Sequence, residues 1–238
     1  MIKAVLFDLD GTLLPMDQDV FINTYFNELT KKMITHGCDP ELLIKWVWAG
    51  TEAMVKNDSG KTNREVFFEV FEEFSGLEIE VYEPIFDRFY REEFDSVRSI
   101  LGSMFGQKEI IDKLRKKNYR IVLATSPVFP LTAAETRLNW IGLKKEDFDH
   151  ITTYENCHYC KPNSKYYQEI FEIIGCKPQE CLMIGNNVRD DMSAAKLGSE
   201  TFLLTDFLEK TNSEYAGLYR KGSVDDLKTL LDQLPVFK

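Results

Sequence analysis

The sequence predicts an α/β fold in which a doubly wound parallel sheet carries a separate helical insertion. Two observations predict the sheet: short apolar runs recur along the chain, and stretches with helical periodicity lie between them. A third predicts the insertion, because more than a hundred residues separate the first two apolar runs and contain helical patterns but no convincing strand. A chain of 238 residues is long enough for both parts.

The apolar runs are typical of strands that are covered on both faces, because they are short and end in turn-forming or polar residues. The predicted strands are residues 4–7, 121–124, 150–153, 181–184 and 201–204. Helical periodicity fills residues 107–117, 130–141, 164–174, 188–197 and 224–234. This alternation predicts βαβ units and therefore a parallel sheet.

The gap between the first two strands is too long for a single crossover connection. Amphipathic patterns predict helices at residues 17–35, 40–56, 63–74 and 82–94. Thr62 and Glu65 have the spacing of a capping box at the start of the third of these helices. We therefore expect residues 16–98 to form a helical domain inserted into an α/β core made of residues 1–15 and 99–238.

Composition and charge limit the kinds of molecule that the protein is expected to bind. The net charge of −10 predicts a surface that repels nucleic acid and anionic membranes. No apolar run approaches the roughly 20 residues that a membrane helix needs, and the chain begins directly in a strand rather than in a signal peptide. Its five cysteines, an odd number, favour free thiols in the cytoplasm. The sequence is compatible with a monomer or a homodimer.

Two carboxylates, Asp8 and Asp10, directly follow the first predicted strand and precede Gly11 and Thr12. In open α/β sheets, ligands bind at the carboxyl ends of the strands. Unpaired buried charge is costly, so two acids at such a place indicate a bound cation and substrate. The alternative is that both are simply turn formers before the glycine.

The segment Asp8-Leu9-Asp10-Gly11-Thr12, with a helical insertion close behind it, resembles the signature D-x-D-G-T of the haloacid dehalogenase-like hydrolases. The resemblance implies a Rossmann-like core with a helical cap. It also implies Mg²⁺-dependent hydrolysis of a small phosphate monoester, a phosphorylated metabolite, through an aspartyl-phosphate intermediate. Asp8 would be the nucleophile and Asp10 the general acid and base.

Two further motifs of this family have matches in the expected order. Thr125 and Ser126 follow the second strand and would bind phosphoryl oxygens, although they also suit the start of a helix before Pro127. Lys161, in the segment Cys160-Lys161-Pro162, would offset the negative charge of the nucleophile and the phosphate. The alternative for Lys161 is an exposed, solvated side chain.

The fourth motif departs from the family pattern. Gly185 is followed by Asn186 where the family commonly has aspartate. An amide oxygen can still coordinate Mg²⁺ or bind a coordinated water, but with one negative charge fewer. Both Asp190 and Asp191 have the spacing of the second acid, and we expect Asp191 to be the more important. The implied metal set is therefore Asp8, Asp10, Asn186 and one or both of these acids.

The helical domain is expected to determine the substrate. Lys56 is a candidate for binding an anionic substrate, whereas Trp46 and Trp48 are expected to pack in the domain's interior. Two other functions fit the same core. A sugar phosphomutase differs mainly in how the cap excludes water. A binding or regulatory protein that has lost catalysis is favoured only by Asn186.

Overall fold

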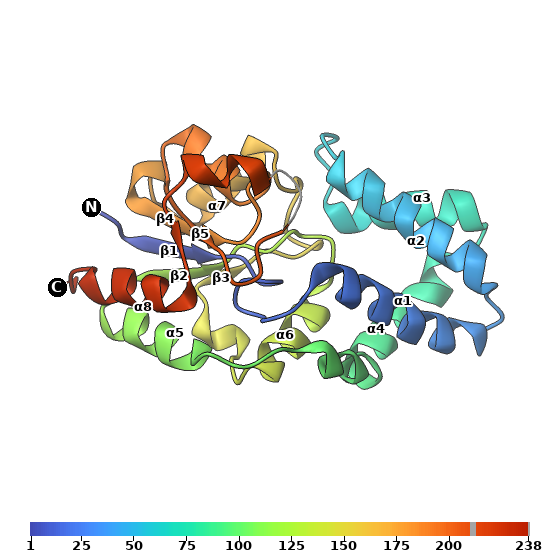
Figure 1. The fold of residues 1–238 in the computed structure, drawn as a ribbon. Helices are drawn as coiled ribbons and strands as arrows, with labels where there is room; N and C mark the ends of the chain where they lie inside the picture. The colour runs from blue at the N-terminus through green and yellow to red at the C-terminus, as the bar shows by residue number, and fades with distance from the viewer. Residues whose placement is uncertain (210–212, 238) are drawn as a thin grey trace.

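A six-stranded sheet forms the centre of the α/β part of the molecule (Figure 1). The computed structural model describes residues 1–209 and 213–237. The strands are β1 (Ala4–Phe7), β2 (Arg120–Leu123), β3 (His150–Ile151), β4 (Cys181–Gly185), β5 (Glu200–Leu204) and β6 (Lys221–Gly222). Their spatial order is β3-β2-β1-β4-β5-β6, and all neighbours are parallel. The predicted parallel sheet is confirmed, and β6 is an additional strand of two residues.

Both faces of the sheet are covered, which explains why β1 is apolar throughout and why β2 and β5 are apolar after their first residues. Side chains alternate between the faces along a strand, so Val5 and Phe7 belong to one buried cluster and Ala4 and Leu6 to another. Helices α5 (Gln107–Lys116), α6 (Leu131–Trp140) and α8 (Val224–Gln233) contribute to the first cluster, and α7 (Ser164–Ile174) contributes to the second. The short 3₁₀ helices of this part are η2 (Lys145–Asp147), η3 (Pro178–Glu180), η4 (Met192–Leu197) and η5 (Ser213–Leu218).

The direction of winding changes between β1 and β4. The chain adds β2 and β3 on one side of β1, and β4, β5 and β6 on the other. Such a reversal leaves a crevice at the carboxyl ends of the two strands, where ligands bind in this class of fold. Phe7, the last residue of β1, is in register with Leu123 of β2 and Ile184 of β4. The polar segments that follow these three strands are therefore brought together.

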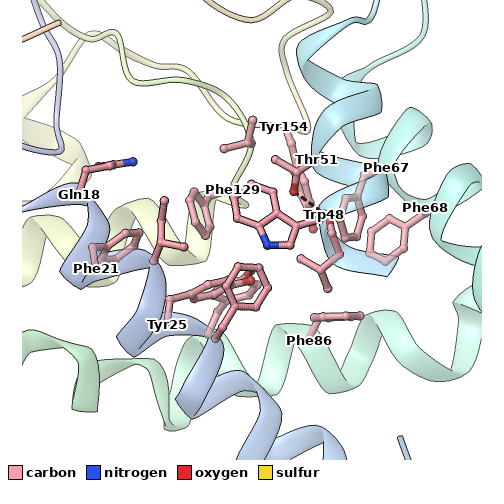
Figure 2. A pocket seen from close by; sticks show the side chains of 15 residues that line it. Gln18, Phe21, Tyr25, Trp48, Thr51, Phe67, Phe68, Phe86, Phe129 and Tyr154 are labelled. Carbon is pink, nitrogen blue, oxygen red and sulfur yellow. Dashed lines mark hydrogen bonds between the residues drawn. The ribbon is translucent and has the colours of Figure 1, made fainter. Parts of the chain in front are cut away.

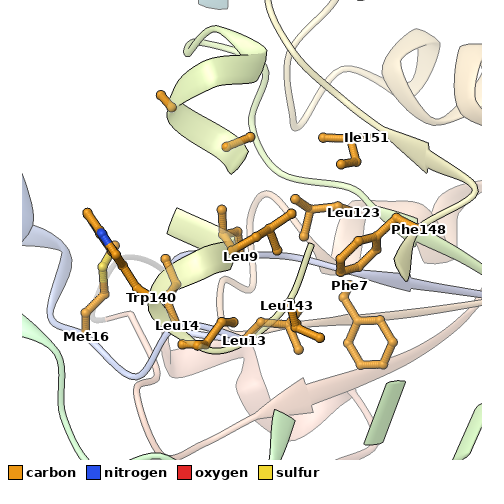
Figure 3. Close-up of a cluster of buried hydrophobic side chains, with 14 of the residues drawn as sticks. Phe7, Leu9, Leu13, Leu14, Met16, Leu123, Trp140, Leu143, Phe148 and Ile151 are labelled. Atoms are coloured by element: carbon orange, nitrogen blue, oxygen red, sulfur yellow. The ribbon is translucent and has the colours of Figure 1, made fainter. Parts of the chain in front are cut away.

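The turn after β1 is anchored in the core. Leu9, Leu13 and Leu14 are buried, and Figure 3 shows them beside Trp140 at the end of α6. The same cluster includes Leu143. Because these apolar side chains point inward, the turn that carries Asp8 and Asp10 has a defined position.

Helices form the other part of the molecule, as predicted. They are α1 (Gln18–Ile34), α2 (Pro40–Val55), α3 (Asn63–Ser75), α4 (Ile79–Glu92) and the 3₁₀ helix η1 (Phe94–Ile100). The predicted capping box of Thr62 and Glu65 is present at the start of α3. Helix α4 begins a turn earlier than predicted, which places Pro84 inside it. Figure 1 shows these helices beyond the carboxyl ends of the strands.

One predicted helix is wrong. Residues 188–197 were expected to be an α-helix, but they form turns followed by η4. The Asn187 side chain accepts hydrogen bonds from the backbone N–H groups of Arg189 and Asp190. Asp17 and Asp39 make the same bonds at the starts of α1 and α2, so the segment begins with a helix-capping pattern but continues as a 3₁₀ helix rather than an α-helix. Among all the helices of the described residues, none is both long enough and apolar enough to cross a membrane.

Candidate active site

A small cavity of about 80 Å³ lies at the carboxyl ends of β1, β2 and β4. It collects the predicted site residues from both sides of the topological reversal. Its lining consists of Asp8, Asp10, Gln18, Thr125, Ser126, Lys161, Asn186, Asn187, Asp190, Asp191 and Glu209. Segments more than 150 residues apart in the chain therefore meet at one point, as between Asp8 and Lys161.

Lys161 is at the centre of the charge network. Its side chain is only 2% exposed, and its Nζ lies 2.8 Å from Oδ1 of Asp8 and 2.6 Å from Oδ1 of Asp191. Burial by itself would lower the pKa of Lys161, but the charges of Asp191 and Asp8 outweigh it and hold the pKa well above its ordinary value. Lys161 is therefore a permanent positive charge beside Asp8.

Asp191 holds Lys161 in place. One carboxylate oxygen accepts the bond from Lys161, and Oδ2 accepts a 2.9 Å bond from the backbone N–H of Asn187. Gly185 makes room for this carboxylate, because a Cβ at Gly185 would lie 2.1 Å from Oδ2 of Asp191. Both oxygens of Asp191 are thus occupied by protein donors.

Asp10 is paired with an arginine from α6. Nη1 of Arg137 lies 3.0 and 2.7 Å from the two carboxylate oxygens of Asp10, and Nε donates to the carbonyl of Ala133. Arg137 is completely buried, with its guanidinium 4.6 Å from the centre of the Phe129 ring. Burial raises the pKa of Asp10, and the charge of Arg137 opposes that rise. The pair fixes the direction of the Asp10 carboxylate.

The remaining acids are not neutralised. The cavity lining contains five carboxylates and one ammonium group. Burial raises the pKa of Asp190, whose nearest cationic partner, Arg189, is 4.0 Å away. Burial, together with the charges of Asp8 and Asp190, raises the pKa of Glu209 to about 7. Carboxylate oxygens are the donors that a hard divalent cation prefers, although among residues 1–209 and 213–237 no three Asp, Glu, His or Cys side chains are grouped closely enough to hold a metal ion as they stand.

The structure explains why position 186 is an amide. Nδ2 of Asn186 donates a 2.7 Å bond to the carbonyl of Phe207, and Oδ1 accepts a 3.3 Å bond from the Thr12 hydroxyl. An aspartate could not donate to the Phe207 carbonyl. Gly11, which has a φ of +76°, allows this close approach, since a Cβ there would lie 2.1 Å from Nδ2 of Asn186.

Thr125 and Ser126 both line the cavity, but Lys56 does not. The backbone carbonyl of Thr125 accepts hydrogen bonds from the hydroxyls of Thr152 and Tyr166, which fix the segment behind the cavity. Lys56 lies just after α2, where its side chain is 71% exposed and paired with Glu52 of the same helix. The structure therefore does not bring Lys56 together with the other predicted residues.

Comparison with known proteins agrees with this geometry. Residues 2–198 match the haloacid dehalogenase-like hydrolase family. The chain belongs to this family. It is 23% identical to a protein named pyrophosphatase PpaX from Bacillus mycoides, over 99% of this chain and 96% of that protein. The expectation of a hydrolase with a Rossmann-like core and a helical cap is confirmed.

Solved structures show the same fold for this haloacid dehalogenase-like hydrolase. A HAD phosphatase from Thermococcus onnurineus matches with a TM-score of 0.58 at 18% identity, covering 99% of this chain and 100% of that one. A HAD family enzyme from Bacteroides thetaiotaomicron, in complex with magnesium and inorganic phosphate, has a TM-score of 0.52 at 18% identity. That match covers 90% of this chain and 99% of the other.

The sequence did not predict four residues of this site. Gln18, Asn187 and Glu209 line the cavity of the hydrolase, and Arg137 is the partner of Asp10. Glu209 follows β5, so its position after a strand was a usable signal. Arg137 gave none, because an arginine near the end of a helix ordinarily complements the helix dipole. Only the packing of α6 against the turn after β1 turns it toward Asp10.

The helical part of the hydrolase is attached to the core at the start of α3. Asn63 is fully buried; its N–H donates to the carbonyl of Cys157, and Nδ2 donates to the carbonyl of Pro127. The N–H of Arg64 donates to the carbonyl of Tyr154. These contacts join the cap to the two core loops that carry Ser126 and Lys161.

Proposed function

We propose that this hydrolase cleaves small phosphate monoesters in a Mg²⁺-dependent reaction through an aspartyl-phosphate on Asp8. The observation that carries the proposal is the ion pair between Asp8 and the buried Lys161 in a cavity that Asp10 also lines. Phosphoryl transfer needs a positioned nucleophile, a positive charge beside the transferred group, and an acid for the leaving oxygen. The three residues have these chemical properties.

In the first step, a carboxylate oxygen of Asp8 forms a bond to phosphorus while the bond from phosphorus to the ester oxygen breaks. The leaving oxygen takes the proton of Asp10, whose pKa is raised by burial. In the second step, Asp10 removes a proton from water, the water oxygen attacks phosphorus, and the bond to Asp8 breaks. Lys161 and the Thr125 hydroxyl hold the non-bridging oxygens throughout.

In this proposal Asp8, the backbone carbonyl of Asp10, Asp190 and Asn186 would hold the metal. We assign Asp191 to orienting Lys161 instead, because both of its oxygens are occupied. When bound, Mg²⁺ supplies positive charge that offsets the nucleophile and the phosphate. The unneutralised carboxylates support this assignment, and the Bacteroides thetaiotaomicron relative is described with magnesium and phosphate.

The test is phosphate release from a panel of small esters and pyrophosphate, measured with Mg²⁺ and after chelation. We expect turnover with Mg²⁺ and a loss of at least about 10²-fold on metal removal, because the carboxylates then repel the substrate. Restored turnover on adding Mg²⁺ back controls for irreversible unfolding. If folded protein releases no phosphate from any compound, the proposal fails, and transfer between sugar positions is then measured to test the mutase alternative.

Gly185→Ala tests whether the reaction needs Asp191 to hold Lys161 in place. We expect kcat for the best ester to fall by about tenfold, because the added methyl displaces the Asp191 carboxylate that orients Lys161. Gly217→Ala is the matched control, since a Cβ there meets no atom within 4 Å. Steady-state kinetics check both variants. Equal kcat values for the two would show that the position of Asp191 does not matter for the reaction.

A further inference from the structure

We infer that the substrate's leaving group is uncharged and apolar, with about the size of one aromatic ring, and that it occupies an aromatic cavity beside the catalytic one. This inference rests on the proposed function. The cavity lies among α1, α2, α3 and α4 and the core segment that contains Val128 and Phe129. Figure 2 shows the rings of Phe21, Tyr25, Phe67 and Phe129 around it.

The cavity has a volume of about 150 Å³. An apolar protein cavity of about this size stays dry and binds benzene. Trp48 is on its lining, and the side chain is poorly buried for a tryptophan, with the residue 45% exposed. The expectation that Trp48 packs in the interior of the helical domain is therefore wrong. Trp48 offers an aromatic face at the cavity instead.

The aromatic cavity adjoins the catalytic one. Gln18 lines both. On the core side, Ser126 lines the catalytic cavity and Val128 lines the aromatic one. Their Cα atoms are at most about 7 Å apart, because only one residue separates them, and the N–H of Val128 donates to the carbonyl of Ser126. A phosphate held at Thr125 and Ser126 therefore places its leaving group at the mouth of the aromatic cavity.

The charges around the site exclude an anionic leaving group. No charged side chain lines the aromatic cavity in the described part of the chain. Three of its hydroxyls are already bonded, Tyr25 to Tyr90 and Thr51 to the carbonyl of Val47, which leaves the Tyr154 hydroxyl and the Gln18 amide among the other polar groups of the lining. A second phosphate or a carboxylate would be buried there without a cationic partner, at high cost. On the other side of Gln18, a further cavity is lined by acids that include Asp17, Asp19 and Asp206 and would repel an anion.

Matched substrates test the inference. We expect kcat/KM for phenyl or benzyl phosphate to exceed that for pyrophosphate and phosphoglycolate by at least about tenfold. Thr51→Phe should fill the cavity and remove this preference. Leu42→Phe is the control, because it adds a ring to the same helix at an exposed position outside the cavity.

The result that overturns the inference is a preference for pyrophosphate or phosphoglycolate that Thr51→Phe leaves unchanged; the proposed function would survive it. If no ester is hydrolysed, the proposed function fails, and calorimetric titration with benzyl alcohol decides the inference by itself. Binding to wild type that is lost in Thr51→Phe and kept in Leu42→Phe supports the cavity's role. No binding, or equal binding to all three proteins, overturns it.

Discussion

Asp8→Asn is expected to reduce phosphate release by at least about 10³-fold, which corresponds to about 4 kcal/mol of lost transition-state stabilisation. The substitution removes the nucleophile's charge but keeps its shape. The amide oxygen can still accept the hydrogen bond that Lys161 now donates to Asp8 at 2.8 Å, and Lys161 keeps its bond to Asp191. The loss is therefore expected in kcat rather than in the folded structure.

Three measurements make this prediction specific. Circular dichroism and thermal unfolding establish that the variant is folded. Asp225→Asn is the matched control, because this side chain is 93% exposed and does not line the catalytic cavity. Acid quenching during turnover of a ³²P-labelled ester should leave label on wild type and none on Asp8→Asn. Full activity in Asp8→Asn would refute Asp8 as the nucleophile and with it the covalent mechanism.

Arg137→Met is expected to lower the free energy of unfolding by about 3–5 kcal/mol, the cost of removing one partner from a buried ion pair. The side chain is completely buried and binds both oxygens of Asp10. Methionine fills much of the volume beside Phe129 but leaves the Asp10 carboxylate without its counter-charge. We also expect kcat to fall by about tenfold or more, because the carboxylate loses its fixed direction.

A double-mutant cycle separates the ion pair from the packing of the arginine. Asp10→Asn and Arg137→Met are combined, and urea unfolding is measured for all four proteins. We expect the double variant to be more stable than Arg137→Met alone, since no unpaired charge then remains buried. Strictly additive losses would mean that Arg137 stabilises the protein by packing alone and does not hold Asp10.

Much of the fold was predictable because its signals are local. The run from Ala4 to Phe7 is buried on both faces, and only a strand inside a covered sheet needs four apolar residues in succession. Thr62 and Glu65 likewise satisfy backbone groups within their own turn, so the start of α3 was readable. The prediction failed at residues 188–197, where Asn187 caps the first turn but the chain continues as a 3₁₀ helix, because tertiary context can override local helix signals.

The site residues likewise fall into those that the sequence predicted and those that only tertiary packing placed. By itself, the sequence placed Asp8 and Thr125 at strand ends and Lys161 between the third strand and the next helix, and a parallel sheet must bring its strand ends to one edge. Only the tertiary structure turned Arg137 toward Asp10, paired Asp191 with Lys161, and left Lys56 on the surface with Glu52. It also formed the aromatic cavity from helices distant in sequence. The reason is physical: strand order and residue type are properties of the chain, whereas a side chain's partner depends on which elements pack together.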